Sequence, residues 1–133
     1  MRAIFLGAHL PQFRLHHSFF EDEVGKLAVF RAADDIVPLW SDFVEDIGEE
    51  GLRKLEIIFY VRNTFLRNYI CDELDLDLRT IEVRSGTPLI KPGDVIFNAV
   101  LVRALPRKKP RSMQREMALA IQSWYYLRLP EGD

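Results

Sequence analysis

The sequence has few cysteines, glycines and prolines, and it has no long hydrophobic run. Cys71 is the only cysteine among 133 residues, which excludes an intrachain disulfide and a cysteine-based zinc site. No apolar run reaches the roughly 18 residues that a membrane span needs, and residues 1–7 lack the long apolar region of a secretory signal. These absences predict a cytoplasmic protein without a membrane partner.

The signatures of several enzyme classes are also missing. The chain has no Walker loop, no dinucleotide-binding GxGxxG, no GxSxG elbow and no HExxH zinc helix. Its histidines, His9, His16 and His17, have no carboxylate or further histidine at ligand spacing. The sequence therefore predicts no metal site and no cofactor.

The hydrophobic content is high enough for a core, at 48% of 133 residues. Short β-branched or apolar runs predict strands, and apolar residues spaced by three and four predict helices. The strands are expected at residues 3–6, 27–30, 55–61, 79–83, 95–102 and 124–128, and the helices at 36–47, 64–74 and 113–121. This alternation predicts a single α/β domain over residues 1–133, with a mixed β-sheet of about five strands covered by helices.

Polar residues mark where these helices begin and end. Asp34 and Asp35 are expected to cap the first helix, which Gly48 is expected to stop. Asn63 or Thr64 is expected to cap the second helix. The run at 3–6 is continuously apolar and is expected to be a central strand buried on two faces. The run at 95–102 is the longest apolar run, with Asn98 as its one polar residue, and it is expected to be a central strand.

The segment from residue 103 to 115 is strongly basic. It contains no acid and six cations, namely Arg103, Arg107, Lys108, Lys109, Arg111 and Arg115. Because the whole chain has a net charge of -2, the other 120 residues carry -8. Such a cluster creates a local field that attracts phosphate, while the surrounding negative charge repels a long polyanion such as duplex DNA. A compact phosphorylated ligand is the expected partner.

The position of the basic segment supports a ligand site. Pro106 and Pro110 predict a loop, which follows the carboxyl end of the longest strand, where open α/β sheets bind ligands. Two other interpretations stay open. The segment can be a solvated run that offsets the acidic stretches at 45–50 and 72–77. It can also act with an acidic face in a non-enzymatic module that binds a protein or RNA.

The order of several short motifs resembles that of the small viral type III anti-CRISPR ring nucleases and their bacterial relatives of the same fold. The matching segments are a strand with a proline-bearing loop at 5–13, a helix at 63–74, the arginine-led strand at 79–83, the turn Pro92-Gly93-Asp94, the Arg-x-Leu-Pro sequence at 103–106, and a final helix and strand at 114–129. The resemblance implies a homodimer that binds and cleaves a cyclic oligoadenylate without a metal, in antiviral signalling or its evasion.

The resemblance also implies roles for individual residues. In that family two arginines, matched here by Arg79 and Arg103, hold the ring in a cleft across the dimer interface. A Gly-His pair supplies the general acid, and this chain has Val61-Arg62 in its place. Arginine stays protonated and is a poor acid, so binding is favoured over efficient cleavage.

His9 follows the first strand and is the candidate general acid, although an ordinary hydrogen-bonded loop histidine is an open alternative. The predicted ligand-binding residues are Arg62, Arg79, Arg103, Arg107, Lys108, Lys109 and Arg111.

Overall fold

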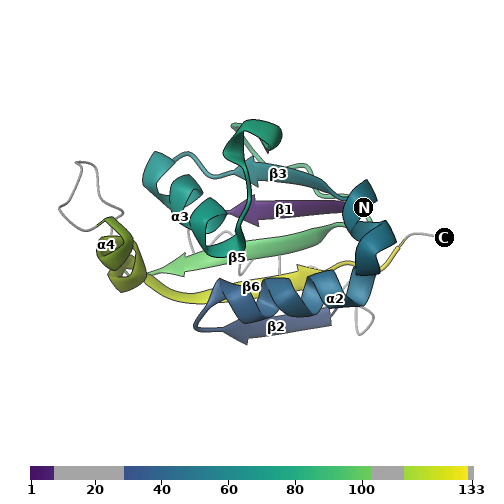
Figure 1. Cartoon of the computed structure of the whole chain (residues 1–133), viewed down its shortest axis with the longest axis horizontal. Coiled ribbons are helices and arrows are strands. Elements are labelled where there is room, and N and C mark those ends of the chain that lie inside the picture. Colours follow the sequence, from purple (N-terminus) through teal and green to yellow (C-terminus); the bar gives the residue numbers. More distant parts are fainter. Residues whose placement is uncertain (8–28, 103–112, 132–133) are drawn as a thin grey trace.

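A computed structural model describes residues 1–7, 29–102 and 113–131 of the chain (Figure 1). The elements in chain order are strands β1 (Arg2–Leu6) and β2 (Val29–Ala33), helix α2 (Ile36–Lys54), strand β3 (Glu56–Tyr60), helix α3 (Thr64–Leu74), the 3-10 helix η3 (Leu78–Thr80), strands β4 (Glu82–Val83) and β5 (Val95–Leu101), helix α4 (Met113–Ala120) and strand β6 (Ile121–Arg128). The predicted single α/β domain with a mixed sheet is confirmed, with six strands.

The six strands form one sheet in the order β2-β6-β5-β1-β3-β4. Strands β5, β1, β3 and β4 run parallel, and β6 is antiparallel to both β5 and β2. All strands except β6 therefore end at the same side of the sheet, which we call the carboxyl edge. Figure 1 shows the arrowheads of β1, β3 and β5 pointing toward the end of the molecule where α4 lies. Strands β1 and β5 are interior, as their apolar runs predict.

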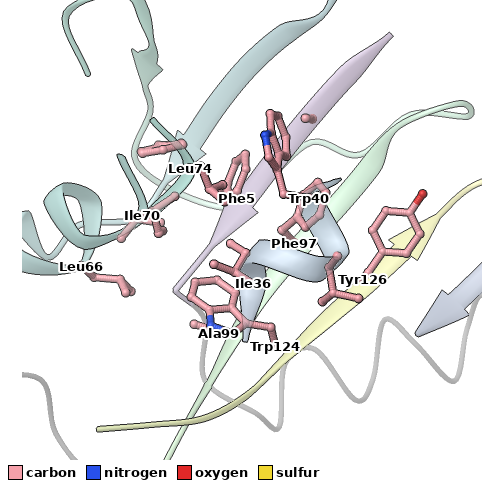
Figure 2. Close-up of a cluster of buried hydrophobic side chains, with 14 of the residues drawn as sticks. Phe5, Ile36, Trp40, Leu66, Ile70, Leu74, Phe97, Ala99, Trp124 and Tyr126 are labelled. Carbon is pink, nitrogen blue, oxygen red and sulfur yellow. The ribbon is translucent and has the colours of Figure 1, made fainter. Parts of the chain in front are cut away.

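A row of aromatic rings crosses the sheet beneath α2 (Figure 2). Phe97 of β5 stacks on Phe5 of β1 with ring centroids 4.9 Å apart and meets Tyr126 of β6 at 5.2 Å. Trp40 of α2 covers Phe5 at 5.7 Å and Phe97 at 5.5 Å, and Phe43 lies 5.7 Å from Phe97. Tilted and stacked rings at these distances stabilise a core beyond their buried area. This row fixes α2 against the sheet.

The opposite face of the sheet is buried as well. Ile4, Leu6 and Ile96 form a second apolar cluster with Leu127 and Leu129, and Ile90, from the β4–β5 connection, packs against it. Side chains alternate between faces along each strand, so a strand buried on both faces is apolar at nearly every position. The apolar runs of β1 and β5, the latter with Asn98 as a buried polar residue, follow from this arrangement.

Two helix caps are confirmed, and Gly48 interrupts α2 where a helix end was expected. The Asp35 carboxylate accepts a hydrogen bond from the Val37 N–H, and the Asn63 side chain accepts one from the Leu66 N–H. Gly48 adopts φ 70° and ψ -179°, a non-helical conformation that glycine tolerates, so the first helical stretch stops there as predicted. A second helical stretch, which the sequence did not predict, continues from this kink to Lys54. None of the described helices is long and apolar enough to cross a membrane.

Other boundaries also differ from the prediction. The strand expected at 79–83 is shortened to β4, because Asp77 accepts a hydrogen bond from the Arg79 N–H and caps η3. Strand β6 begins at Ile121, three residues early, where the last helix was expected to continue. Strand β2 extends to Ala33, and residues 27–28 of its predicted range lie outside the described residues.

An ion pair joins β1 to the turn before β5. Arg2 donates from Nε to Oδ1 of Asp94 at 3.0 Å and from Nη2 to Oδ2 at 2.7 Å. The Arg2 Nη2 also donates to the Leu89 carbonyl, and the Lys91 N–H donates to Asp94. Because the two side chains are 15% and 4% exposed, the pair is largely removed from water. The predicted turn at 92–93 is present, with Gly93 at φ 86°.

Candidate functional site

The carboxyl edge contains a point where the direction of the chain's connections changes. Strands β1 and β3 are neighbours in the sheet. Strand β2, which follows β1 in the chain, lies on one side of this pair, and β4, which follows β3, lies on the other. In open α/β sheets such a switch point leaves a crevice at the carboxyl ends of the strands, and ligands bind there. The topology therefore singles out the region after Leu6 and Tyr60.

Gly7 allows the end of β1 and the start of α3 to come together at this point. A Cβ atom at position 7 would lie 2.6 Å from Cδ2 of Leu66 and 3.3 Å from Cγ1 of Val61. Both neighbours are fully buried and have little room to move. Glycine at this position therefore keeps the first turn of α3 against the switch point.

The turn between β3 and α3 is held by Arg67. Its Nη1 donates to the Val61 carbonyl at 3.2 Å and its Nη2 donates to Oγ1 of Thr64 at 3.0 Å. The Nε of Arg67 is buried without a hydrogen-bond partner. Arg67 thus adds a positive charge beside the first turn of α3, where unpaired backbone N–H groups also favour anions. Arg67 is not among the residues predicted from the sequence, where its spacing of three from Thr64 is the only available signal.

Arg62 is exposed and lies between β3 and α3, next to the switch point. Val102, just after β5, donates its N–H to the Ala120 carbonyl at 2.9 Å, so the chain leaves β5 and returns through α4 at the carboxyl edge. Strands β5 and β3 lie on either side of β1, and neighbouring strands are about 4.8 Å apart. The strands β5 and β3 are therefore about 10 Å apart.

Most of the predicted ligand-binding set, together with the candidate acid, falls in the two stretches that begin at this edge. His9, Arg103, Arg107, Lys108, Lys109 and Arg111 lie outside the described residues. His9 comes two residues after Gly7 in the sequence, and Arg103 comes directly after Val102. Arg62, His9 and Arg103 therefore each follow one of three adjacent parallel strands.

Arg79 is placed differently. It precedes β4, whose Glu82 aligns through Ile58 and Ile4 with Ile96 of β5. Ile58 is two residues before Tyr60 at the end of β3, or roughly 7 Å along the strand direction. The Arg79 side chain is 89% exposed and donates two hydrogen bonds to the Asp77 carboxylate, which raises the pKa of Arg79. Arg79 thus precedes β4 and is engaged by Asp77, whereas Arg62 follows β3.

A concave surface lies between α2 and strands β2 and β6, away from the switch point. It is an open groove of about 780 Å³ with Phe43 and Leu39 on one side and Tyr126 on the other. Its charged rim consists of Arg31, Asp42, Glu45, Asp46 and Arg128.

Much of the charge on this rim is already paired. Nη1 of Arg31 lies 3.4 Å from Oδ2 of Asp42, and Arg128 forms an ion pair with Asp46. Burial raises the pKa of Tyr126, so its phenol stays protonated at neutral pH. The groove thus resembles a polar binding surface more than a site of acid–base chemistry.

Two further features bear on reactivity. Within residues 1–7, 29–102 and 113–131, no three histidine, cysteine or acidic side chains are grouped so that they could hold a metal ion. Burial raises the pKa of the Cys71 thiol, which disfavours the nucleophilic thiolate.

No protein-family model, curated protein or solved structure matches the chain. Function is therefore argued from the site itself.

Proposed function

We propose that this protein binds a compact phosphorylated ligand of the cyclic oligoadenylate type at the carboxyl edge of its sheet. The observation that carries the proposal is that exposed Arg62 follows β3 at the β1–β3 switch point, close to Arg67. The chain enters the basic segment 103–115 from Val102 after β5, two strands away. A cyclic oligonucleotide presents several phosphates over a short distance, which suits a group of cations.

The chemistry of the edge supports anion binding. Among the described residues, Arg62 has no ion pair, whereas Arg79 is engaged by Asp77. Arg67 is held over the β3–α3 turn and contributes its charge without moving. Preorganised cations of this kind stabilise a bound phosphate because little ordering is required when the ligand arrives.

Cleavage would follow from the same binding mode. The ribose 2′-hydroxyl loses its proton to water as its oxygen attacks the adjacent phosphorus, the bond from phosphorus to the 5′-oxygen breaks, and the products carry a 2′,3′-cyclic phosphate and a 5′-hydroxyl. The protein's part is to align these atoms, to stabilise the charge on phosphorus, and to supply the proton that the 5′-oxygen takes up, for which His9 is the candidate. Binding is the primary proposal, and product formation is measured alongside it.

Cyclic tetraadenylate or cyclic hexaadenylate is expected to raise the melting temperature of the protein. Arg62→Ala and the pair Arg103→Ala with Arg107→Ala are each expected to abolish most of this shift, because each removes cations that the proposal assigns to the phosphates of the ligand. The unliganded melting temperature should stay within a few degrees. Thermal unfolding with and without ligand, together with chromatography of the ligand, measures both binding and cleavage.

Arg53→Ala is the matched control. Arg53 is exposed at the end of α2 and precedes β3, whereas Arg62 follows it, so the same charge is removed from the opposite edge of the same strand. This variant should keep the full ligand shift. Absence of stabilisation by either ring in the wild-type protein, or equal losses in the Arg53 and Arg62 variants, would contradict the proposal.

The groove beside α2 favours a second candidate, the non-enzymatic interaction module. Three acidic side chains, Asp42, Glu45 and Asp46, line the groove, and the basic segment supplies the opposite charge elsewhere. A protein that works in this way should show no stabilisation by cyclic oligoadenylates, and Arg62→Ala should behave like Arg53→Ala. The same thermal unfolding experiment therefore separates the two candidates.

A further inference from the structure

Strand β4 forms one end of the sheet and has an open hydrogen-bonding edge. The Arg84 N–H donates to the Phe59 carbonyl of β3 at 2.8 Å. Backbone groups of successive residues in a strand point alternately to its two sides, so the N–H and C=O of Val83 point away from β3. The Val83 side chain is 43% exposed, and no described strand pairs on that side. An edge of this kind is a template for another strand.

The side chains on this edge complement themselves. Glu82 and Arg84 are two residues apart, so they share one face of the strand, and within the protomer they form an ion pair with contacts of 2.8 and 2.9 Å. If a second β4 runs antiparallel to the first about a two-fold axis at Val83, Glu82 of each copy lies opposite Arg84 of the other. Opposite charges facing each other across strands stabilise the pairing.

The backbone allows this arrangement over a short stretch. The two Val83 residues exchange both N–H···O=C bonds, as directly opposed residues of an antiparallel pair do. Ile81 donates its N–H to Leu78, and Gly86 turns the chain with φ 90°, so the paired stretch is confined to residues 81–85. Charge complementarity must then contribute much of the specificity.

The other end of the sheet is less suited to self-pairing. The middle residue of β2 is Arg31, which is exposed. A two-fold axis at that residue would place Arg31 opposite Arg31, and like charges facing each other across strands are destabilising. Among the two sheet ends, charge complementarity therefore selects β4.

From these observations we infer that the protein forms a homodimer in which β4 of one copy pairs antiparallel with β4 of a second copy, joining two six-stranded sheets into one. This inference does not rest on the proposed ligand. It has a consequence for ligand binding, because antiparallel pairing directs the carboxyl edges of the two protomers to opposite ends of the joined sheet. Each protomer then holds its own ligand.

Sedimentation velocity on four proteins tests this dimer: wild type, Glu82→Arg, Arg84→Glu and the charge-swapped double variant. The wild type should sediment with twice the mass of the chain. Each single reversal places like charges opposite each other and should halve the mass. The double variant restores complementarity and should restore the dimer. Circular dichroism checks that each variant is folded.

Two further variants keep the outcome interpretable. Arg79→Glu makes the same charge change as Arg84→Glu in an exposed ion pair that lies outside β4, and it should remain dimeric. Val83→Pro removes the outward-pointing N–H of the edge without removing a hydrogen bond to β3, and this variant should be monomeric. The inference is overturned by a monomeric wild-type protein at every concentration tested, or by a dimer that survives both single reversals and Val83→Pro.

Discussion

Replacing Asp94 with alanine is expected to lower the free energy of unfolding by about 3–5 kcal/mol, because it leaves the guanidinium of Arg2 in a largely buried place without its partner. Asp94 accepts three hydrogen bonds, two from Arg2 and one from the Lys91 N–H. The hydrogen-bonded contact with Asp94 is the main reason that the pKa of Arg2 is raised. Urea unfolding followed by circular dichroism measures the loss.

Arg79→Met provides the comparison. Arg79 forms an ion pair of similar geometry with Asp77, but its side chain is 89% exposed, and such pairs contribute little to stability. The variant should unfold near the wild-type midpoint. The double variant Arg2→Met with Asp94→Ala should recover part of the loss, because no charge is left unpaired. Equal destabilisation by Asp94→Ala and Arg79→Met would show that burial of the Arg2–Asp94 pair is not what matters.

Replacing Phe97 with alanine is expected to cost about 3–5 kcal/mol of folding free energy, through lost burial and the cavity left behind. Phe97 is fully buried in the middle of the sheet and contacts four other aromatic rings. These belong to Phe5, Trp40, Phe43 and Tyr126. Because they are packed from both sides of β5 and from α2, the neighbours have little freedom to fill the space. Equilibrium unfolding in urea measures the cost.

Val102→Ala is the control for this experiment. Val102 follows the same strand, but its side chain is largely exposed, so its truncation should change stability by no more than about 0.5 kcal/mol. A cost for Phe97→Ala below about 1 kcal/mol, or one equal to that of Val102→Ala, would contradict the central place of the aromatic row in the core.

Local signals in the sequence predicted much of the fold. The apolar runs of β1 and β5 and the caps at Asp35 and Asn63 depend on neighbouring residues alone, and all of them are present. Gly48 shows the limit of such reasoning. Its positive φ interrupts the helix as expected, but the second helical stretch to Lys54 is decided by residues beyond the glycine.

The arrangement of the candidate site depends on contacts that no local pattern carries. The sequence indicated that Arg62 follows one strand and Arg103 another, but the order of strands in the sheet decides that β5, β1 and β3 are neighbours. Arg79 precedes β4 and forms an ion pair with Asp77, although the sequence predicted that Arg79 opens a strand. The contact of Arg67 with Thr64 follows a helical spacing of three, whereas the groove beside α2 arises from tertiary packing, so motif spacing gave no warning of the groove.

The most direct test of the proposed ligand site is a titration of isotope-labelled protein with cyclic hexaadenylate, followed by the chemical shifts of backbone amides. The account predicts the largest changes at the switch point and beside the basic segment, at Gly7, Arg62, Asn63, Thr64 and Val102. Changes confined to the α2 groove around Asp42, Asp46 and Tyr126, or no changes at all, would contradict binding at the carboxyl edge.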